Sequence, residues 1–350
     1  MRPALAAAPP GRMLPIALPL PVLVATFCLL WSSAFSATKL ALADCPPLLL
    51  LTARFLIAGV VMVGAAAVSG RTWRRVARRD LIVLAALGVA NNALYLGLIY
   101  VGMGSISSGL SAIIVSTNPV LTALLAAVFL DECMTWRKVA GLALGIGGVA
   151  FIVESRIASG IDSPVGIMLT VAGLVSLVGG TILFKSLAPK GGLWIGNGVQ
   201  NLAGGLALVP FAFTLESIRE VVPSWRLIVA LGYCALLVSI IGYLLWFYLL
   251  NTSGVTTASA YHFLMPPLGM LFGWLLISER IAFADLIGIV PVALGIFLVT
   301  RPAVRPRTRD VGKASDATRL NLRGSDGMSI ADQNDLARTR VVTRITSPGK

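Results

Sequence analysis

The chain has 350 residues, of which 57% are hydrophobic and only 12% are charged, and its mean hydropathy is +0.88. A soluble domain has about 25% charged residues, so a chain this apolar is expected to lie in a lipid bilayer rather than fold as a water-soluble globule. The net charge of +13 would suit nucleic acid, but the basic residues occupy short loops and the C-terminal tail. Membrane topology explains that placement better, so membrane lipid and not nucleic acid is the expected partner.

The predicted elements begin with a cytoplasmic N-terminus, residues 1–17, and a first apolar run, Leu18–Ala37. That run is longer than the apolar part of a signal peptide and lacks a cleavage pattern, so we interpret it as a retained span. Nine further runs follow: Leu48–Val68, Leu81–Val101, Ser107–Leu130, Val139–Val153, Val165–Phe184, Leu193–Leu215, Leu227–Leu250, Thr256–Ile277 and Phe283–Val299. A spanning helix needs about 20 residues and satisfies its own backbone, so the sequence predicts an all-α membrane protein with ten transmembrane helices, the fifth and tenth short.

The orientation follows from the basic residues. If the N-terminus is inside, 22 of the 28 Lys and Arg residues fall inside and 5 outside, with Arg54 within a span. Without the tail the ratio is still 11 to 5. The positive-inside rule therefore predicts a multi-pass protein of the inner membrane with both termini cytoplasmic. The tail, residues 301–350, is basic and polar without an apolar period, and we expect it to be disordered.

A repeat divides the membrane region into two halves. A shift of 147 residues places Pro119 on Pro266 and Glu132 on Glu279, and nearly the same shift relates the earlier spans. The repeats are therefore residues 18–153 and 165–300, with five spans each. Because five is odd, the second repeat is predicted to be inverted relative to the first, a plan typical of secondary transporters.

The two prolines interrupt the fourth and ninth spans. A proline inside a helix lacks a backbone N–H and crowds the carbonyl four residues earlier, so each freed carbonyl must face protein, water or a ligand. One interpretation is a simple kink satisfied by neighbouring Ser or Thr residues. The other is a kink beside a binding site, which makes Pro119 and Pro266 candidate hinges.

Several stretches together resemble the EamA-type domain of the drug/metabolite transporter superfamily. They are Trp31–Leu42 (WSSAFSATKLAL), Pro47, Ala53–Phe55 (ARF), Asn118–Pro119, Phe129–Glu132 (FLDE) and Gly141–Gly145 (GLALG), with Pro266, Ser278–Arg280 (SER) and Gly288 in the second half. The resemblance implies a ten-helix inverted-repeat carrier, commonly an exporter of amino acids, related metabolites or drugs. The halves differ, because Gln200 stands where the first has Arg54 and Leu177 where it has Trp31.

Polar and aromatic residues within the spans are the candidate substrate-binding groups. A polar side chain facing lipid is costly, so these residues should point into the bundle, either as cavity lining or as hydrogen-bond partners of neighbouring helices. Aromatic residues near span ends instead form interfacial belts, and Trp246 fits either interpretation. The candidates are Trp31, Asn92, Tyr95, Asn118, Tyr243, Trp246, Tyr261 and His262.

Two charged or titratable residues within spans carry alternatives. His262 is the only histidine, so it is a candidate for coupling a proton to transport, but a single titratable group shows no relay, and a neutral histidine bonded to a neighbour is the favoured interpretation. Arg54 could snorkel to the surface, pair with a carboxylate or bind a substrate anion, and we expect one of the first two. The Gly141–Gly145 and Gly269–Gly273 pairs predict close packing within the bundle or, as the second interpretation, a homodimer.

Motifs for other functions are missing. The sequence has no phosphate-binding GxxxxGK[ST] loop, no HExxH and no GxSxG, and its four cysteines lack metal-ligand spacing. We therefore expect no cofactor, no metal and no enzyme activity. The predicted function is a secondary transporter that moves a small metabolite such as an amino acid by alternating access, more in the direction of export. The alternatives are an organic-anion or sugar-phosphate exchanger, a membrane-embedded enzyme and a channel.

Overall fold

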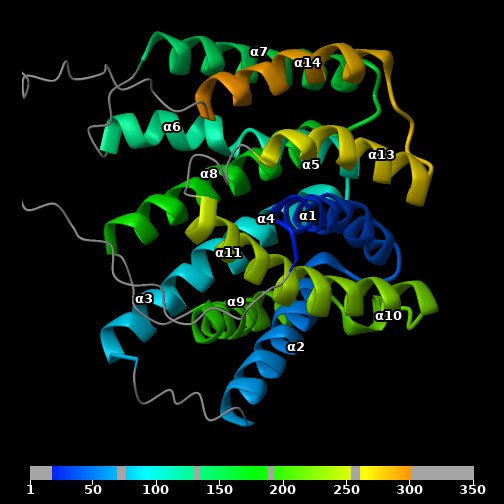
Figure 1. Cartoon of the computed structure of the whole chain (residues 1–350). Coiled ribbons are helices and arrows are strands. Elements are labelled where there is room, and N and C mark those ends of the chain that lie inside the picture. Colours follow the sequence, from blue (N-terminus) through cyan, green and yellow to red (C-terminus); the bar gives the residue numbers. More distant parts are fainter. Residues whose placement is uncertain (1–17, 69–75, 130–134, 188–192, 254–260, 301–350) are drawn as a thin grey trace, which may run out of the picture. The chain divides into compact units, whose positions relative to one another are not determined.

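The computed structural model describes residues 18–68, 76–129, 135–187, 193–253 and 261–300, and every regular element in these ranges is a helix (Figure 1). Eight helical stretches there are long and apolar enough to cross a membrane, and two shorter apolar helices, Met265–Ile277 and Phe283–Leu298, follow. The predicted all-α membrane protein is thereby confirmed in its class. The predicted N-terminal segment and C-terminal tail lie outside the described residues.

The described residues of the first half form seven α-helices and one π-helix. In chain order these are α1 (Leu20–Leu42), α2 (Pro47–Val68), α3 (Arg78–Gly88), the π-helix η2 (Val89–Tyr95), α4 (Leu96–Met103), α5 (Ser108–Ser116), α6 (Asn118–Phe129) and α7 (Trp136–Ala158). The third predicted span therefore corresponds to the continuous run α3–η2–α4, and the fourth to α5 and α6.

The second half has a similar succession of elements, with two additional 3-10 helices among its described residues. It contains α8 (Pro164–Leu187), α9 (Leu193–Leu215), the short 3-10 helix η3 (Ile218–Glu220), α10 (Trp225–Gly232), the π-helix η4 (Tyr233–Gly242), α11 (Tyr243–Ser253), the 3-10 helix η5 (Tyr261–Leu264), α13 (Met265–Ile277) and α14 (Phe283–Thr300). The eighth predicted span is the run α10–η4–α11, which matches α3–η2–α4 of the first half.

Two helices are longer than the apolar pattern predicts. The predicted first span ends at Ala37, yet α1 continues to Leu42 and includes Lys39. The predicted fifth span ends at Val153, yet α7 continues to Ala158 and includes Arg156. Polar partners explain both differences: Lys39 donates hydrogen bonds to the carbonyls of Met103, the last residue of α4, and of Ile106, and Arg156 forms buried salt bridges.

Equivalent helices of the two halves pack against each other in antiparallel pairs. A Cβ atom added to Gly59 of α2 would lie 2.7 Å from Leu202 of α9, and one added to Gly205 would lie 3.0 Å from Leu56. Moving from Gly59 back to Leu56 on α2 corresponds to moving forward from Leu202 to Gly205 on α9. The two helices therefore run in opposite directions.

The pair α7 and α14 repeats this arrangement, and the two helices lie side by side (Figure 1). A Cβ on Gly148 would lie 2.9 Å from the carbonyl oxygen of Gly288, and one on Gly295 would lie 2.5 Å from that of Gly141. Only glycine permits this backbone approach. The glycines therefore pack helices within the chain, which is the first of the two interpretations of the glycine pairs, while the homodimer stays a prediction.

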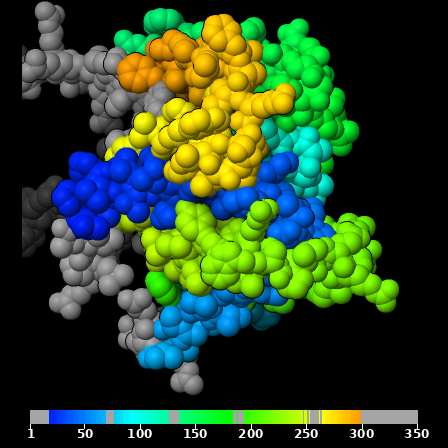
Figure 2. Space-filling model, turned by 90° about the vertical axis from the view of Figure 1, so that its right-hand side faces the viewer, coloured from blue at the N-terminus to red at the C-terminus, as the bar shows by residue number. Residues whose placement is uncertain are grey.

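The described outer surface of the helices is strongly apolar. On the face in Figure 2, α1 runs between α13 above and α10 below, and both helices contact it. Exposed apolar positions of these three helices include Leu29 of α1, Ile228 of α10 and Leu275 of α13. Such continuous exposed apolar surface is typical of helices in contact with lipid. The chain is therefore a multi-pass membrane protein.

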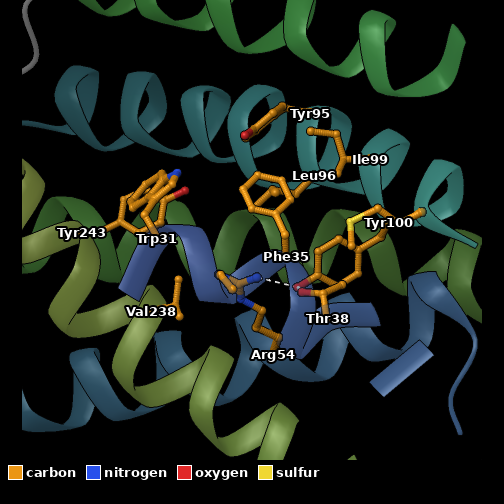
Figure 3. Close-up of a pocket in the computed structure, with 12 residues that line it drawn as sticks. Trp31, Phe35, Thr38, Arg54, Tyr95, Leu96, Ile99, Tyr100, Val238 and Tyr243 are labelled. Atoms are coloured by element: carbon orange, nitrogen blue, oxygen red, sulfur yellow. Dashed lines mark hydrogen bonds between the residues drawn. The ribbon is translucent and has the colours of Figure 1, made fainter. Parts of the chain in front are cut away.

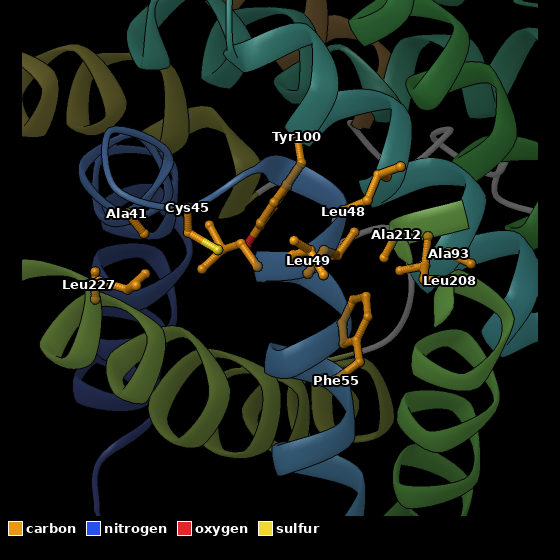
Figure 4. Close-up of a cluster of buried hydrophobic side chains, with 13 residues drawn as sticks. Ala41, Cys45, Leu48, Leu49, Phe55, Ala93, Tyr100, Leu208, Ala212 and Leu227 are labelled. Carbon is orange, nitrogen blue, oxygen red and sulfur yellow. The ribbon is translucent and has the colours of Figure 1, made fainter. Parts of the chain in front are cut away.

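The interior of the bundle is built from apolar residues of both halves. One cluster joins α1, α2 and α4 to α9 and α10, and the ring of Phe55 and residues such as Leu49, Tyr100, Leu208 and Leu227 lie within it (Figure 4). This cluster fixes α2 against α9. Because Phe55 belongs to the cluster, its neighbour Arg54 is held inside the bundle.

Candidate functional site

A small cavity lies where α1, α2, α4 and α11 meet (Figure 3). Its volume is about 40 Å³, and its lining residues are Trp31, Ala34, Phe35, Thr38, Arg54, Tyr95, Leu96, Ile99, Tyr100, Met103, Val238 and Tyr243. A single water needs about 10–15 Å³ on this measure, so the cavity has room for about three waters. The first half supplies most of the lining and the second half supplies Val238 and Tyr243.

The aromatic wall of the cavity begins on α1. Trp31, Phe35 and Thr38 are spaced by four and three residues, so they share one face of that helix. The ring of Trp31 lies 5.1 Å from that of Tyr243 at an interplanar angle of 47°. Tilted aromatic pairs at this distance attract each other, which fixes α1 against α11 at this side of the cavity.

Arg54 is the charged residue of the lining. Its side chain is buried, with 3% of the residue exposed. Nε donates a hydrogen bond of 2.9 Å to Oγ of Ser239, and Nη1 donates to the hydroxyl of Tyr100. The guanidinium carbon lies 5.6 Å from the centre of the Phe55 ring and 5.9 Å from that of Tyr100. The expectation that Arg54 snorkels to the surface is therefore wrong, because hydroxyl and aromatic partners hold it inside the bundle.

The second expectation for Arg54, a structural carboxylate pair, is not met among the described residues. The carboxylates near its end of α2 have other partners. Glu216 accepts hydrogen bonds of 2.8 Å from the backbone N–H groups of Leu48 and Leu49, and Asp44 accepts one from Ser224. Glu216 therefore compensates the N-terminus of α2 rather than the guanidinium.

A second buried arginine lies away from the cavity. Arg156 of α7 donates to both carboxylate oxygens of Asp285, at 2.8 and 2.6 Å, and to Asp162 at 2.8 Å. Nearby, Glu279 accepts hydrogen bonds from the N–H groups of Ser108 and Gly109 at the start of α5, at 2.7 and 3.1 Å. These contacts join α14 and the end of α13 to the first half at the N-terminus of α5.

Three of the predicted binding residues meet in the cavity. Trp31, Tyr95 and Tyr243 line it and come from three separate spans, as the sequence predicts (Figure 3). Arg54, Tyr100 and Thr38 line it too, although none of them was among the candidates. Arg54 offered a signal, being an arginine within an apolar span, whereas the period of an apolar helix does not show which tyrosine or threonine faces a cavity.

The other predicted residues lie elsewhere among the described elements. Asn92 is 2% exposed and packs against α9, where a Cβ on Gly204 would lie 2.5 Å from its own. Asn118 accepts a hydrogen bond of 3.0 Å from Thr122. Trp246 stacks on Phe27 at 5.5 Å, and the backbone oxygen of Tyr261 accepts from the thiol of Cys28. The contacts of Asn92, Trp246 and Tyr261 join helices to each other, whereas that of Asn118 lies within α6. The side chain of His262 lies outside the described residues.

The two prolines stand directly after helix breaks. Thr117, with ψ of 0°, separates α5 from α6, and Pro119 is the second residue of α6. Pro266 is likewise the second residue of α13, which follows the 3-10 helix η5. The hydroxyls of Ser116 and Thr117 donate to the carbonyls of Ile113 and Ile114, at 2.7 and 2.6 Å. Both acceptors precede the carbonyl of Val115, which is the one that Pro119 crowds, so the two interpretations of the break stay predictions.

Both halves also contain a π-helix beside the cavity, which the apolar pattern of the sequence does not predict. A shift of 147 residues places η2, residues 89–95, on residues 236–242, which lie within η4. Tyr95 ends η2, and Val238 belongs to η4, so each π-helix contributes to the lining. A π-helix leaves the ordinary hydrogen-bond ladder and is frequent at functional sites.

Metal binding finds no support in the described part of the chain. No group of three or more His, Cys, Asp or Glu side chains that could hold a metal ion occurs there. The described lining of the cavity offers one guanidinium, hydroxyl groups and aromatic rings. Such a set can bind and orient an organic molecule that has one polar end and one apolar end.

Comparison with known proteins identifies relatives of the chain. A model of the EamA-like transporter family matches residues 20–154 and again residues 164–301. An uncharacterized transporter of Archaeoglobus fulgidus is 29% identical over 271 residues, which cover 77% of this chain and 95% of that protein. The inner membrane transporter YedA of Escherichia coli K12 is 25% identical over 302 residues, which cover 83% and 97%.

A third relative has a more specific name. A probable terminal-alkyne amino-acid exporter of Streptantibioticus cattleyicolor is 28% identical over 286 residues, which cover 77% of this chain and 90% of that protein. One crystal structure of a protein shares the fold, with a TM-score of 0.58 and 18% identity over 82% of this chain and 98% of that one. All three relatives are named as transporters, and the two matches to one family model correspond to the two predicted repeats.

Proposed function

We propose a substrate class and a mechanism for this chain, which belongs to the EamA-like transporter family. It is a secondary transporter that moves a small metabolite, an amino acid or a related compound, across the cytoplasmic membrane. The observation that carries the proposal is the cavity itself: a buried guanidinium and an aromatic wall face each other inside a bundle whose outer surface is apolar. The direction is export, which the name of the amino-acid exporter among the relatives supports.

The proposed architecture is ten spans in two inverted repeats, residues 18–153 and 165–300. The antiparallel pairs α2 with α9 and α7 with α14 support inversion, because equivalent helices of inverted repeats must run in opposite directions. The basic residues support cytoplasmic termini. A reporter enzyme fused after Lys350 should therefore read cytoplasmic, and periplasmic activity would overturn the orientation.

The proposed mechanism is alternating access. A cavity of about 40 Å³ is far below the 300–1,000 Å³ of ordinary ligand sites, so the binding state must be wider than the present one. Pro119 and Pro266 are the proposed hinges, and η2 and η4 are further segments whose hydrogen bonds can rearrange. Because these devices recur in both halves, each half can adopt the conformation of the other and open the site to the opposite side.

The residues proposed to contact the substrate are Trp31, Tyr95 and Tyr243. They line the cavity, whereas Asn92, Trp246 and Tyr261 contact other helices and Asn118 accepts a hydrogen bond within α6. His262 is proposed on sequence grounds as the group that couples a proton, since histidine titrates near physiological pH. His262→Gln should then flatten the pH dependence of transport, and an unchanged profile would remove the histidine from the coupling step.

A second candidate function is the exchange of organic anions. Arg54 in the cavity favours it, because such an exchanger needs a basic residue deep in its site. Counterflow separates the candidates. Liposomes that contain the purified protein are loaded with one unlabelled metabolite, and the entry of its labelled form into the liposomes is measured. Amino acids should exchange and phosphorylated sugars should not. No counterflow with any amino acid or organic acid in the panel would refute the proposed function.

A further inference from the structure

Arg54 has unused hydrogen-bonding capacity that faces the cavity. A guanidinium carries five N–H donors, and the structure assigns one from Nε to Ser239 and one from Nη1 to Tyr100. Within the described ranges no hydrogen bond from Nη2 occurs, so three N–H groups remain for a ligand. Donors on Nη1 and Nη2 lie side by side in a fixed plane. That plane matches the two oxygens of a carboxylate.

The charge of Arg54 also lacks a carboxylate partner in the described structure. It lies seven residues into α2, about 10 Å along the helix, at a depth where an isolated charge is expensive. Ser239 and Tyr100 are neutral, and the aromatic faces of Phe55 and Tyr100 provide weak compensation. A carboxylate bound in the cavity would supply the missing negative charge.

The remainder of the lining determines what the carboxylate is attached to. Arg54, Tyr100 and Thr38 form one polar group, and Thr38 donates a hydrogen bond of 3.0 Å to Tyr100 (Figure 3). The tilted pair of Trp31 and Tyr243 lies apart from that group in the same view, across the cavity. The guanidinium and the aromatic pair thus lie on different sides of the site, which suits a molecule with a charged head and an aromatic or branched body.

We propose that Arg54 binds the carboxylate of the transported molecule and that the cargo is a monocarboxylate with an aromatic or branched body. This inference rests on the proposed function and narrows its substrate class. A phosphate ester would bring about two negative charges at neutral pH. The described lining offers a single guanidinium and no lysine to meet them, since Lys39 donates to the carbonyls of Met103 and Ile106. Sugar phosphates are therefore poor cargo.

The first test compares ligands that differ only in the head group. 3-Phenylpropionate is paired with 3-phenylpropanamide, and phenylalanine with phenylalaninamide, each as a competitor of labelled phenylalanine in counterflow. The amide keeps the body but loses the charge that Arg54 recognises. A charge-assisted pair should favour each acid over its amide by about 10- to 100-fold in half-inhibitory concentration. Equal inhibition by acid and amide would overturn the inference.

The second test changes the receptor. Arg54→Gln should abolish the preference for the acid over its amide, and Arg54→Lys, which keeps the charge but not the planar fork, should retain part of it. Arg226→Gln is the matched control, because Arg226 is exposed on α10 and lies outside the cavity lining. It removes the same charge and should keep the full preference. An Arg54→Gln protein that still prefers the acid would contradict the role of Arg54.

The outcomes separate the inference from the function on which it rests. If amino acids exchange but acid and amide compete equally, the proposed transport function is supported and the proposed carboxylate site is refuted. If no compound of the panel exchanges, and none shifts the melting temperature of the purified wild-type protein, both the proposed function and the carboxylate site are refuted. If Arg54→Gln does not fold, judged by size-exclusion chromatography in detergent, the acid–amide comparison on the wild type and on Arg54→Lys still decides the question.

Discussion

Two buried arginines lie in the same bundle with very different surroundings. Arg156 and Arg54 are each 3% exposed, yet Arg156 forms hydrogen bonds to two aspartates and to Ser107, whereas Arg54 has one serine and one tyrosine. The first charge is balanced twice over by Asp285 and Asp162. The second has no carboxylate partner among the described residues.

The difference indicates two roles for the same side chain. A fully paired guanidinium is a cross-link, and it lies where α14 joins the first half of the chain. An arginine without a carboxylate partner in a cavity is costly to keep there, so its surroundings make more sense as one half of a binding site. Breaking the contacts of Arg156 should therefore lower the stability of the protein, and altering the surroundings of Arg54 should lower its affinity for the substrate.

The largest expected effect is on the cross-link. Asp285→Ala removes both oxygens that Arg156 contacts on α14 and leaves the arginine with Asp162. Leaving a buried charge uncompensated costs about 3–5 kcal/mol, and because Asp162 offsets part of this cost, the melting temperature in detergent and the yield should fall by less than such a loss implies. Arg226→Gln serves as the exposed control and should change little. A variant as stable as the wild type would show that the Arg156 contacts are not structural.

The next effect separates two tryptophans. Trp31→Leu removes the aromatic partner of Tyr243 in the cavity, while Trp246→Leu removes a ring that stacks on Phe27 outside it. An aromatic contact contributes about 0.5–1.5 kcal/mol beyond its area. Trp31→Leu should therefore raise the KM for an aromatic amino acid about three- to tenfold and leave that for an aliphatic one less changed. Trp246→Leu should lower stability only, and an equal rise in KM would contradict the assignment.

A smaller effect is expected at the partner of Arg54. Tyr100→Phe keeps the ring but removes the hydroxyl that accepts from Arg54 and Thr38. One hydrogen bond contributes about 1 kcal/mol, so KM should rise about fivefold as the guanidinium loses its orientation. Because Tyr100 acts through Arg54, the rise should vanish in an Arg54→Gln background. Additive effects of the two changes would show that Tyr100 contacts the substrate on its own.

The smallest effect concerns a helix cap. Glu279→Gln removes the charge that faces the N–H groups of Ser108 and Gly109 at the start of α5, while the amide oxygen can still accept one hydrogen bond. Charge at a helix N-terminus contributes about 0.3–1 kcal/mol. Thermal unfolding should detect a small loss of stability with acid–amide selectivity unchanged. A lost selectivity would tie this end of α5 to the substrate site.

The pattern of apolar runs predicts most of the helices, because a lipid-spanning helix needs a continuous apolar stretch. The repeat predicts more than that: glycines matched by the shift, such as Gly148 and Gly295, make matched contacts in the structure. The ends of α1 and α7 are missed because their last turns carry Lys39 and Arg156. A charge is accepted there through partners that are distant in the sequence, such as Asp285.

The site is predicted only in part for a related reason. Helical periodicity tells which residues share a face, but not which face borders a cavity and which packs on a neighbour. Asn92 and Tyr95 belong to one π-helix, yet Asn92 contacts α9 and Tyr95 lines the cavity. The same limit applies to Arg54, because the orientation of its side chain depends on a hydrogen bond to Ser239, which lies 185 residues away in the sequence. Gln200, its counterpart in the second half, bonds to Gly196 within its own helix, so the repeat alone does not place the site.

The central claim is that the cavity beside Arg54 is the transport site and opens to one side of the membrane and then to the other. The most direct measurement places one cysteine in its lining, Ile99→Cys, in a chain without the native cysteines, and applies a membrane-impermeant maleimide from either side of sealed vesicles. Labelling should occur from each side in turn, and phenylalanine should slow it from both. Labelling from one side only, or labelling that phenylalanine does not affect, would contradict the claim.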